Sequence, residues 1–315
     1  MAIPTQQIGA WVEKPGPDAR ITLKNDLPVP SPAAGQVLIK VECTGVCHSD
    51  VYSISGHTPM ISHIAGHEGI GKIIKTGPGV SQDVLNKRNV DGTFQQYVVS
   101  PLKPLTFIPD ALDSNGAAPL LCAGITVYSA ILKLNILPGE WLLIPGAGGG
   151  LGHLAVQIAH SKGFKVIAVD TGYAKRKLCV DLGATHFLDF KTDDVPAMVK
   201  KITDGYGVHG AVCLASSRAG YDQTISLLRN LGTLVCVGLG MDDLPVSPFQ
   251  TICRGLRIIG SSVGSAKEMN ELLEMAASGQ VKAIVDVFDF KDLDEVLQKL
   301  QRNEISGRAV VRLPA

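Results

Sequence analysis

The stretch 141–160, WLLIPGAGGGLGHLAVQIAH, decides the fold of the second half of this chain. The apolar run 141–144 is typical of a buried parallel strand, and a glycine-rich segment follows it at once. Apolar residues then recur at helical spacing as far as Ala159. Glycines let the backbone approach a ligand closely, and the first turn of a helix offers unpaired N–H groups to a phosphate. The stretch therefore predicts a strand, a phosphate-binding turn and a helix.

The next apolar run, 164–169, ends in Asp170, which is placed about 18 residues beyond Gly152. An acid at about this spacing meets a ribose hydroxyl in dinucleotide-binding folds. The loop reads G-x-G-G-G-x-G, one residue longer than the strict G-x-G-x-x-G spacing. Alone it would be a weak signal, because many helices begin at glycine-rich turns. The flanking strand, helix and acid together favour a dinucleotide site over a turn without a ligand.

The pattern of the chain changes near Ala117. Before that point, short alternating segments broken by prolines predict antiparallel strands and turns. A helix is expected over 118–134, and strands then alternate with helices. This alternation predicts an α/β fold with a parallel sheet wound on both faces, built from two halves of three strands each. The expected strands are 141–145, 164–169, 186–189, 210–214, 232–238 and 256–260.

Composition excludes several classes of protein. The 315 residues are 45% hydrophobic and 18% charged, with a formal net charge of zero, which argues against a nucleic-acid partner. No apolar run approaches the roughly 18 residues of a membrane span, and the N-terminus lacks the features of a signal peptide. Seven scattered cysteines fit reduced thiols in the cytoplasm better than a disulfide framework.

Four residues of the β-rich half are candidate metal ligands: Cys47, His67, Glu68 and Cys122. Zinc prefers thiolate and imidazole ligands, and catalytic zinc sites use three protein ligands and an open position. Their spacing is too long to be diagnostic. Taken singly, each cysteine is better explained as a small buried apolar residue. His57 and His63 lie close in sequence and are competing candidates.

Several motifs carry a resemblance to a known family. They are GVCHSD (45–50), GHEGIG (66–71), DGTFQQYVV (91–99), LCAGITVY (121–128), the glycine loop, VIAVD (166–170) and ISGRAVV (305–311). With them the chain resembles, nearly end to end, the zinc-containing alcohol dehydrogenases of the medium-chain dehydrogenase/reductase superfamily, especially the fungal and bacterial tetrameric type. The resemblance implies a GroES-like catalytic domain over 1–124, to which 266–315 return, and a Rossmann NAD-binding domain over 125–265.

The resemblance also implies roles for residues. Cys47, His67 and Cys122 would ligate one catalytic zinc, Glu68 would ligate it transiently, and Asp50 would orient His67. Ser49 would bind the alcohol and begin a proton relay. The residues implied in NAD binding are His48, Gly146, Gly148, Gly149, Gly150, Leu151, Gly152, Asp170, Lys175, Val263 and Arg308. The substrate would be a small alcohol or aldehyde, and the assembly a homodimer or homotetramer.

The chain departs from the family in one segment. The family carries a lobe with four closely spaced cysteines that hold a structural zinc, but no C-x-x-C occurs in this sequence. The segment GVSQDVLNKRNVDGTFQQY (79–97) runs across that place, and the family's G-D-R-V strand is also missing. We therefore expect a truncated GroES-like domain without structural zinc, with a more exposed strand edge and lower stability. Tyr52 stands where many relatives place a relay histidine.

Two other functions compete with zinc-dependent alcohol oxidation. The first is a zinc-free reductase of the same superfamily that acts on enones or quinones with NADPH; the Cys47, His67, Cys122 set and Asp170 argue against it. The second is a non-catalytic nucleotide-binding remnant, whose metal site was lost with the lobe. The retention of all three expected ligands and of Glu68 favours activity.

Overall fold

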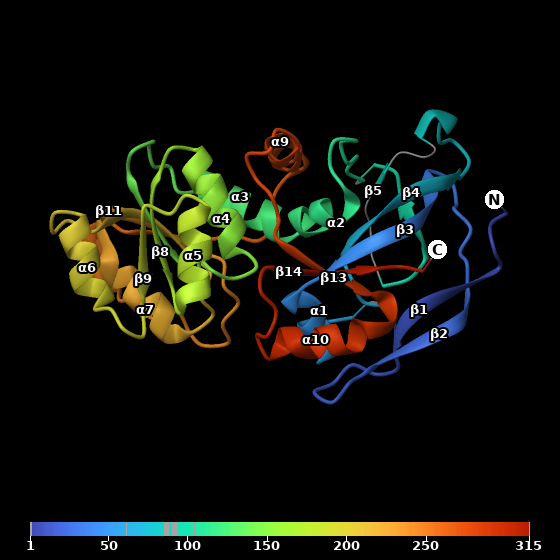
Figure 1. Ribbon diagram of the computed structural model, residues 1–315, viewed down its shortest axis with the longest axis horizontal. Coiled ribbons are helices and arrows are strands. Elements are labelled where there is room, and N and C mark those ends of the chain that lie inside the picture. The colour runs from blue at the N-terminus through green and yellow to red at the C-terminus, as the bar shows by residue number, and fades with distance from the viewer. Residues whose placement is uncertain (1, 61, 85–87, 90–93, 104, 315) are drawn as a thin grey trace. The chain divides into compact units, whose positions relative to one another are not determined.

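The computed structural model describes the chain except for residues 1, 61, 85–87, 90–93, 104 and 315 (Figure 1). The chain divides into two compact units. The first unit combines Met1–Cys122 with Ala283–Ala315, and the second is Ala123–Lys282. The sequence predicted a return to the first unit at 266, whereas the structure keeps 266–282 in the second unit, where helix α9 (Ala266–Ala277) packs on α3 (Ala123–Leu132).

The second unit contains a six-stranded sheet in which every neighbouring pair is parallel. Its order is β12 (Arg257–Gly260), β11 (Leu228–Cys236), β10 (Val208–Cys213), β7 (Trp141–Pro145), β8 (Lys165–Asp170) and β9 (His186–Asp189). The two halves of three strands meet at β7 and β10, so the prediction of a Rossmann sheet is confirmed. Besides α3 and α9, the helices of the second unit are α4 (Gly152–Ser161), α5 (Tyr173–Asp181), α6 (Val195–Ile202), α7 (Arg218–Leu227) and α8 (Pro248–Arg254).

The core of this sheet explains why its strands are apolar along their whole length. Leu142, Leu143 and Ile144 of β7 are at most 1% exposed, because helices cover both faces of a parallel sheet. Helix α4 is buried from Gly152 to Ala159, including His153 and Gln157. Gln157 is satisfied there by the backbone of Lys282, from which its side chain accepts and to which it donates a hydrogen bond.

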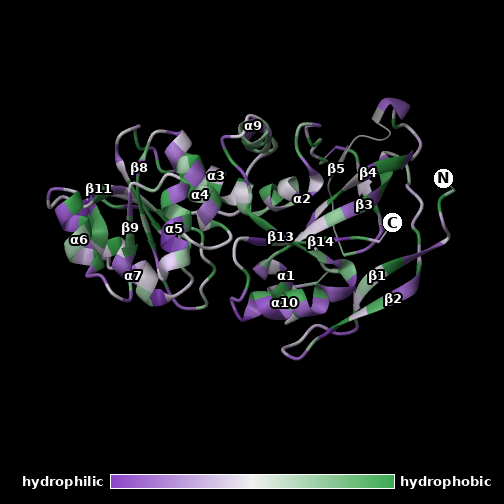
Figure 2. Cartoon of the chain, viewed as in Figure 1, coloured by the Kyte–Doolittle hydropathy of each residue, from purple (hydrophilic) through white to green (hydrophobic). Residues whose placement is uncertain are grey.

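The first unit contains a second sheet, in the order β13 (Val285–Asp289), β14 (Arg308–Arg312), β3 (Gln36–Val46), β4 (Glu68–Thr76) and β5 (Arg88–Asn89), with β6 (Tyr97–Pro101) paired to β3. Strands β1 (Gln6–Val12) and β2 (Ile21–Pro28) form an antiparallel pair. The helices are α1 (His48–Ile54), α2 (Ser114–Ala117) and α10 (Leu293–Gln301). Helix α10 is amphipathic and buries its residues 293, 296, 297 and 300. Figure 2 shows both hydrophobic and hydrophilic residues along this helix.

The segment 79–97, which runs across the place of the family's lobe, is described only in part. Among the described residues, only the two residues of β5 pair with the outer edge of β4, at Gly71 and Lys72. The rest of that edge has no strand partner in the described part of the chain.

Two features differ from the sequence prediction. The helix expected over 118–134 is broken at Cys122, where the 3-10 turn η2 (Ala118–Leu121) ends and α3 begins. Strand β13 was not predicted. Within the described residues no single helix is long and apolar enough to cross a membrane; the bent pair Ser114–Leu121 and Ala123–Leu132 passes on length and composition only.

Candidate metal centre and cofactor loop

The first element of the metal centre is the junction of β3 and α1. Cys47 is the N-cap of α1, between the last residue of β3 and the first residue of the helix. Its backbone N–H donates a 2.9 Å hydrogen bond to Oδ2 of Asp50, which lies three residues later in the first turn. An acidic side chain that closes back on the N-cap fixes the entry of the chain into a helix. The Cys47 thiol is therefore held on a rigid turn.

Asp50 also holds the second candidate ligand. Its other oxygen, Oδ1, accepts a 2.8 Å hydrogen bond from Nδ1 of His67, and the carboxyl group is only 2% exposed. A carboxylate on Nδ1 leaves Nε2 as the nitrogen that can bind a metal. Nε2 lies 3.8 Å from Oε1 of Glu68, the first residue of β4. This direct contact with His67 supports the expected positioning role of Asp50.

Cys122 completes the group from a distant part of the sequence. The break between η2 and α3 places its Sγ 4.0 Å from Sγ of Cys47. Two sulfurs bound at about 2.3 Å to one tetrahedral zinc would lie about 3.8 Å apart. One ligand atom from each of Cys47, His67, Glu68 and Cys122 lies within 4.8 Å of the others. The donor set and its spacing fit a zinc ion.

Glu68 and Arg308 form a buried ion pair behind this cluster. Nη2 of Arg308 lies 2.5 Å from Oε1 of Glu68, and the two side chains are 3% and 0% exposed. Oε2 of Glu68 and Nε of Arg308 are buried without a protein partner. Burial raises the pKa of Glu68 to about 7, although Arg308 opposes that rise. A buried carboxylate oxygen without a donor is costly, so a cation beside it fits the site.

Glycine is required opposite this carboxylate. A Cβ at Gly45 would lie 2.0 Å from Oε2 of Glu68. Gly45 pairs with Glu68 across β3 and β4, so the strand register itself brings the acid to this position. The motif that includes Gly45 and Cys47 therefore provides both a ligand and the space for Glu68.

The protons of the cluster are shared between its members. The hydrogen bond with Cys122 holds the pKa of Cys47 well below its usual range despite burial, and the same bond raises the pKa of Cys122. Burial lowers the pKa of His67, but the hydrogen bonds that it makes with Asp50 and Cys47 outweigh burial and raise that pKa to about 11. A divalent cation would replace the protons that the ligands share.

The other predicted residues of this unit lie in or near the cluster. Oγ of Ser49 is 3.7 Å from Sγ of Cys47. His48 is exposed at the start of α1. His57 and His63 do not join the cluster, since His63 stacks on Trp11 with ring centroids 4.2 Å apart and His57 tilts against Tyr52.

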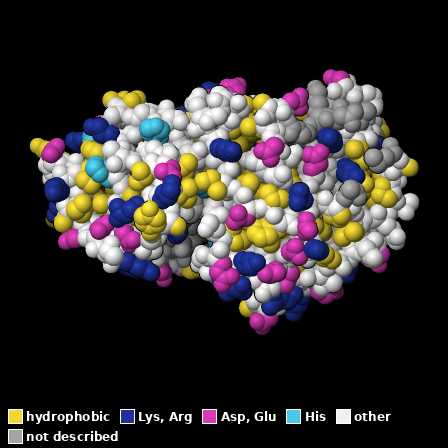
Figure 3. All heavy atoms as spheres, in the orientation of Figure 1, with side chains coloured by type: hydrophobic (Ala, Val, Ile, Leu, Met, Phe, Trp, Pro, Cys, Tyr) yellow, Lys and Arg dark blue, Asp and Glu magenta, His cyan; other side chains and the backbone are white. Residues whose placement is uncertain are grey.

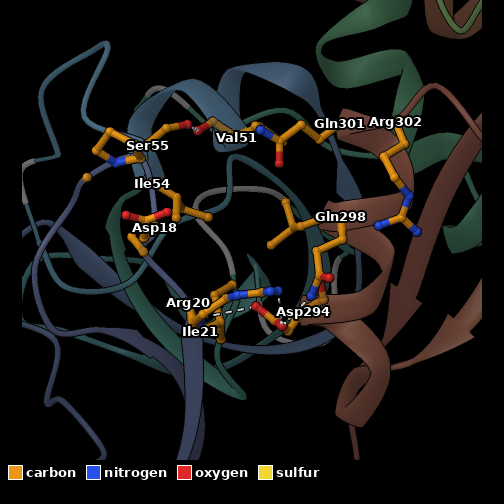
Figure 4. A pocket seen from close by; sticks show the side chains of 14 residues that line it. Asp18, Arg20, Ile21, Val51, Ile54, Ser55, Asp294, Gln298, Gln301 and Arg302 are labelled. Atoms are coloured by element: carbon orange, nitrogen blue, oxygen red, sulfur yellow. Dashed lines mark hydrogen bonds and ion pairs between the residues drawn. The ribbon is translucent and has the colours of Figure 1, made fainter.

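A separate cavity of about 460 Å³ lies on the other side of α1 (Figure 4). It is lined by the turn that precedes β2, by α1 and by α10, and none of the four cluster residues reaches it. Two of its charged groups pair with each other, since Asp294 accepts from both the Arg20 guanidinium, at 3.1 Å, and the Ile21 backbone. This cavity is therefore no extension of the metal centre.

In the second unit, the glycine loop has the geometry of a phosphate-binding turn. Gly146 has a φ of +82°, a left-handed conformation that side chains rarely adopt. A Cβ at Gly152, the first residue of α4, would lie 2.2 Å from the carbonyl oxygen of Gly146. The loop therefore packs backbone on backbone at the N-terminus of a buried helix, which suits an anion.

Asp170 lies at the end of β8 and is bonded to this loop. Its carboxylate is buried, and it accepts hydrogen bonds from the Gly148 N–H at 2.9 Å and the Thr171 N–H at 2.8 Å. Lys175 forms a 2.8 Å ion pair with the same group. Gly148, Gly149, Gly150 and Leu151 complete the turn, and Val263 is exposed with a φ of +44°. Asp170 and Lys175 thus act as one charged pair beside the loop.

Sequence reasoning missed one feature of the centre, the Glu68–Arg308 contact. The resemblance placed Arg308 on the cofactor phosphates, whereas in the structure its guanidinium is buried against Glu68. The two residues are 240 positions apart in the sequence. No local pattern signals such a pair; a buried arginine in an apolar strand was the available hint.

Known proteins are similar to this chain over its whole length. Residues 33–110 match the alcohol dehydrogenase GroES-like domain, and residues 150–278 match the zinc-binding dehydrogenase family. Alcohol dehydrogenase 1 of Emericella nidulans is 36% identical over 352 positions that cover 100% of both chains. The chain belongs to the zinc-containing alcohol dehydrogenase family. An alcohol dehydrogenase of Schizosaccharomyces pombe is 35% identical and covers 99% of both chains.

Solved structures of this family agree with the fold. Acetophenone reductase from Geotrichum candidum, determined in complex with NAD, is 28% identical with a TM-score of 0.88 and covers 99% of this chain and 98% of that one. The alcohol dehydrogenase of Aeropyrum pernix is 28% identical with a TM-score of 0.87, covering 97% and 99%. The alignment with the Emericella nidulans protein spans 352 positions, 37 more than the 315 residues of this chain, so gaps in this chain account for that difference.

Proposed function

We propose that this protein is an NAD-dependent, zinc-dependent alcohol dehydrogenase that oxidises a primary or secondary alcohol to an aldehyde or ketone. The observation that carries the proposal is the convergence of Cys47, His67 and Cys122, three residues with the ligand chemistry of catalytic zinc, beside the buried Glu68. Relatives that align with the whole chain and are named alcohol dehydrogenases support the proposal.

Cys47, His67 and Cys122 would hold the zinc ion, and Glu68 lies near enough to act as an alternative ligand. When bound, zinc supplies a Lewis acid that polarises the substrate oxygen and lowers the pKa of the alcohol. Asp50 keeps His67 in the tautomer whose Nε2 faces the other ligands. Arg308 neutralises the Glu68 carboxylate and limits its attraction for the metal, because the pair is only 2.5 Å apart.

Ser49 is the residue proposed to take the alcohol proton. Its hydroxyl lies 3.7 Å from the Cys47 sulfur, so it neighbours any oxygen that approaches the metal from that side. Tyr52 occupies the position where many relatives have a relay histidine, and we propose that the proton leaves Ser49 for water. His48, exposed next to Cys47, is proposed to bind cofactor phosphate.

The glycine loop and Asp170 are proposed to bind NAD, which supplies the hydride acceptor when it is present. Backbone N–H groups of residues 150–152 would bind the pyrophosphate, and the Asp170 carboxylate would bind the adenosine ribose. The carboxylate would repel a 2′-phosphate, which favours NAD over NADP. Lys175 and Val263 are proposed as further cofactor contacts.

We further propose that the protein forms a homo-oligomer through the second unit. Strand β12 is the edge of the sheet, and Met241, Phe249 and Ile252 nearby in sequence are 75–83% exposed. An unpaired strand edge beside exposed apolar side chains is typical of an interface. A reducing compartment such as the cytoplasm would keep Cys47 and Cys122 available as ligands.

Zinc content and turnover, measured together, test the proposal. We expect about one zinc per chain by elemental analysis and alcohol-dependent reduction of NAD, with both lost in Cys47→Ser. A protein that binds NADH but contains no zinc and oxidises no alcohol would be a nucleotide-binding remnant. Zinc-independent reduction of enones by NADPH would instead make it a reductase, and either result would overturn the proposal.

A further inference from the structure

The second unit has a cavity of about 550 Å³ between the C-terminal ends of α6 and α7 and the start of β11. Lys200, Arg229 and Arg254 line it together with Tyr206, and no Asp or Glu does. On the face seen in Figure 3, by contrast, acidic and basic side chains are interspersed, as a net charge of zero requires. Three cations around one cavity are therefore a local concentration of charge.

The helix ends explain only part of this charge. Arg254 donates hydrogen bonds to the backbone carbonyls of Ile225 and Leu228, and so closes the C-terminal end of α7. Lys200 lies in the last turn of α6. Each helix C-terminus carries about half a negative charge. Two such ends offset roughly one of the three positive charges and leave about two.

Arg229 is not satisfied by its protein neighbour. Its Nη1 lies 2.6 Å from Nε2 of His209, while Nδ1 of the same ring accepts a hydrogen bond from the Trp141 N–H at 3.2 Å. A neutral imidazole has one N–H and one acceptor nitrogen, so it cannot accept from both donors. The contact with Arg229 is the shorter of the two, so Nε2 accepts from the guanidinium. A guanidinium has five N–H donors, and within the described residues this bond uses one of them.

Lys200 and Tyr206 offer further groups to a ligand. Lys200 is exposed, and no ion pair holds it within the part of the chain that the structure describes. Tyr206 is 74% exposed on the loop that follows α6. An exposed aromatic ring beside cations suits a ligand that combines an anion with a flat apolar group. The cavity volume lies within the range of small-molecule sites.

We propose that this cavity binds a phosphate monoester that carries a flat or aromatic group, at a site separate from the glycine loop. A phosphate monoester carries a charge of about −1.5 to −2 at neutral pH, which matches the excess of about two positive charges. Its oxygens accept from Lys200, Arg229 and Arg254, and its organic part lies against Tyr206. The site is independent of the proposed catalytic function.

The matched pair Lys200→Gln and Lys201→Gln tests this site, because both lysines lie in the last turn of α6 but only Lys200 lines the cavity. Isothermal titration of the whole protein with phenyl phosphate and with inorganic phosphate is the measurement. We expect Lys200→Gln to weaken both affinities about tenfold, the effect of one charge-assisted hydrogen bond. Lys201→Gln should change them less than about twofold, since exposed charges at a distance contribute little.

Two further arms separate the site from alternatives. Tyr206→Ala should weaken phenyl phosphate about fivefold and leave inorganic phosphate unchanged, because only the first can stack. Binding should persist in the presence of NADH. Phosphate binding that is absent, that both lysine variants reduce equally, or that NADH displaces would overturn the proposal. The comparison of Lys200→Gln with Lys201→Gln tests phosphate binding in this cavity even if the protein does not bind NADH.

Discussion

The metal centre and the glycine loop are built in opposite ways. The metal centre is made of side chains at the start of α1, at the start of β4 and at the end of η2, and its two cysteines lie 75 positions apart. The glycine loop is made of backbone within a few consecutive residues, held by one carboxylate at the next strand end. Chemistry that needs charge and ligands depends on the whole first unit, whereas phosphate recognition depends on local backbone geometry.

This difference predicts that the two sites can be lost separately, with the largest effect at the metal centre. Cys47→Ser should remove a zinc ligand and lower alcohol oxidation by roughly a thousandfold or more, because several kcal/mol of transition-state stabilisation depend on the metal. NADH affinity should stay within about twofold. Elemental analysis, turnover and NADH fluorescence are the measurements. Equal loss of NADH binding would show that the two sites are not separable.

Asp170→Asn sharpens the comparison from the other side. It removes the charge that bonds Gly148 and Lys175, and should weaken NAD about 10- to 100-fold, the effect of one charged hydrogen bond. The preference for NAD over NADP should fall at the same time, since the repulsion of a 2′-phosphate is gone. Zinc content should not change, and a loss of zinc in this variant would contradict the expected independence.

How far the sequence predicted the fold follows the same division. The glycine loop, β7, β8 and Asp170 were predicted because their signal is contiguous, and the prediction of the Rossmann sheet was right. The break of the helix at Cys122 was not predicted, since η2 and α3 together form one largely apolar run. The Glu68–Arg308 pair and the two-residue strand β5 depend on distant segments meeting. The four metal residues were found by resemblance, not by spacing.

Two glycines of the loop test whether its backbone packing matters. Gly152→Ala places a Cβ 2.2 Å from the Gly146 carbonyl and should destabilise the second unit by about 1–3 kcal/mol, with weaker NADH binding. Gly149→Ala is the matched control, because its Cβ would lie 3.4 Å from the same oxygen. Urea unfolding of both variants is the measurement. Similar losses in the two would mean that flexibility, not close packing, selects glycine here.

The smallest effect is expected at a helix cap remote from both sites. Glu268 accepts a hydrogen bond from the Ser265 N–H at the start of α9, and this contact lowers its pKa below 4.5. A carboxylate with a lowered folded pKa stabilises the fold above about pH 4.5 and loses that contribution as pH falls. Glu268→Gln should therefore cost about 0.5–1 kcal/mol at pH 7. The measurement is urea unfolding of the wild type and of Glu268→Gln at several pH values. If the difference in their free energies of unfolding does not shrink as the pH falls, this account is refuted.

The discontinuous first unit has a consequence for synthesis of the protein. Strand β3 pairs with β14, which comes from the last residues of the chain, and the whole second unit is made between them. At ordinary translation rates the ribosome needs on the order of ten seconds for that interval. During this time the partner edge of β3 is open while the second unit folds. The nascent chain thus has an interval in which the open edge of β3 is accessible to chaperones and to neighbouring chains, and this interval ends once β14 has left the ribosome.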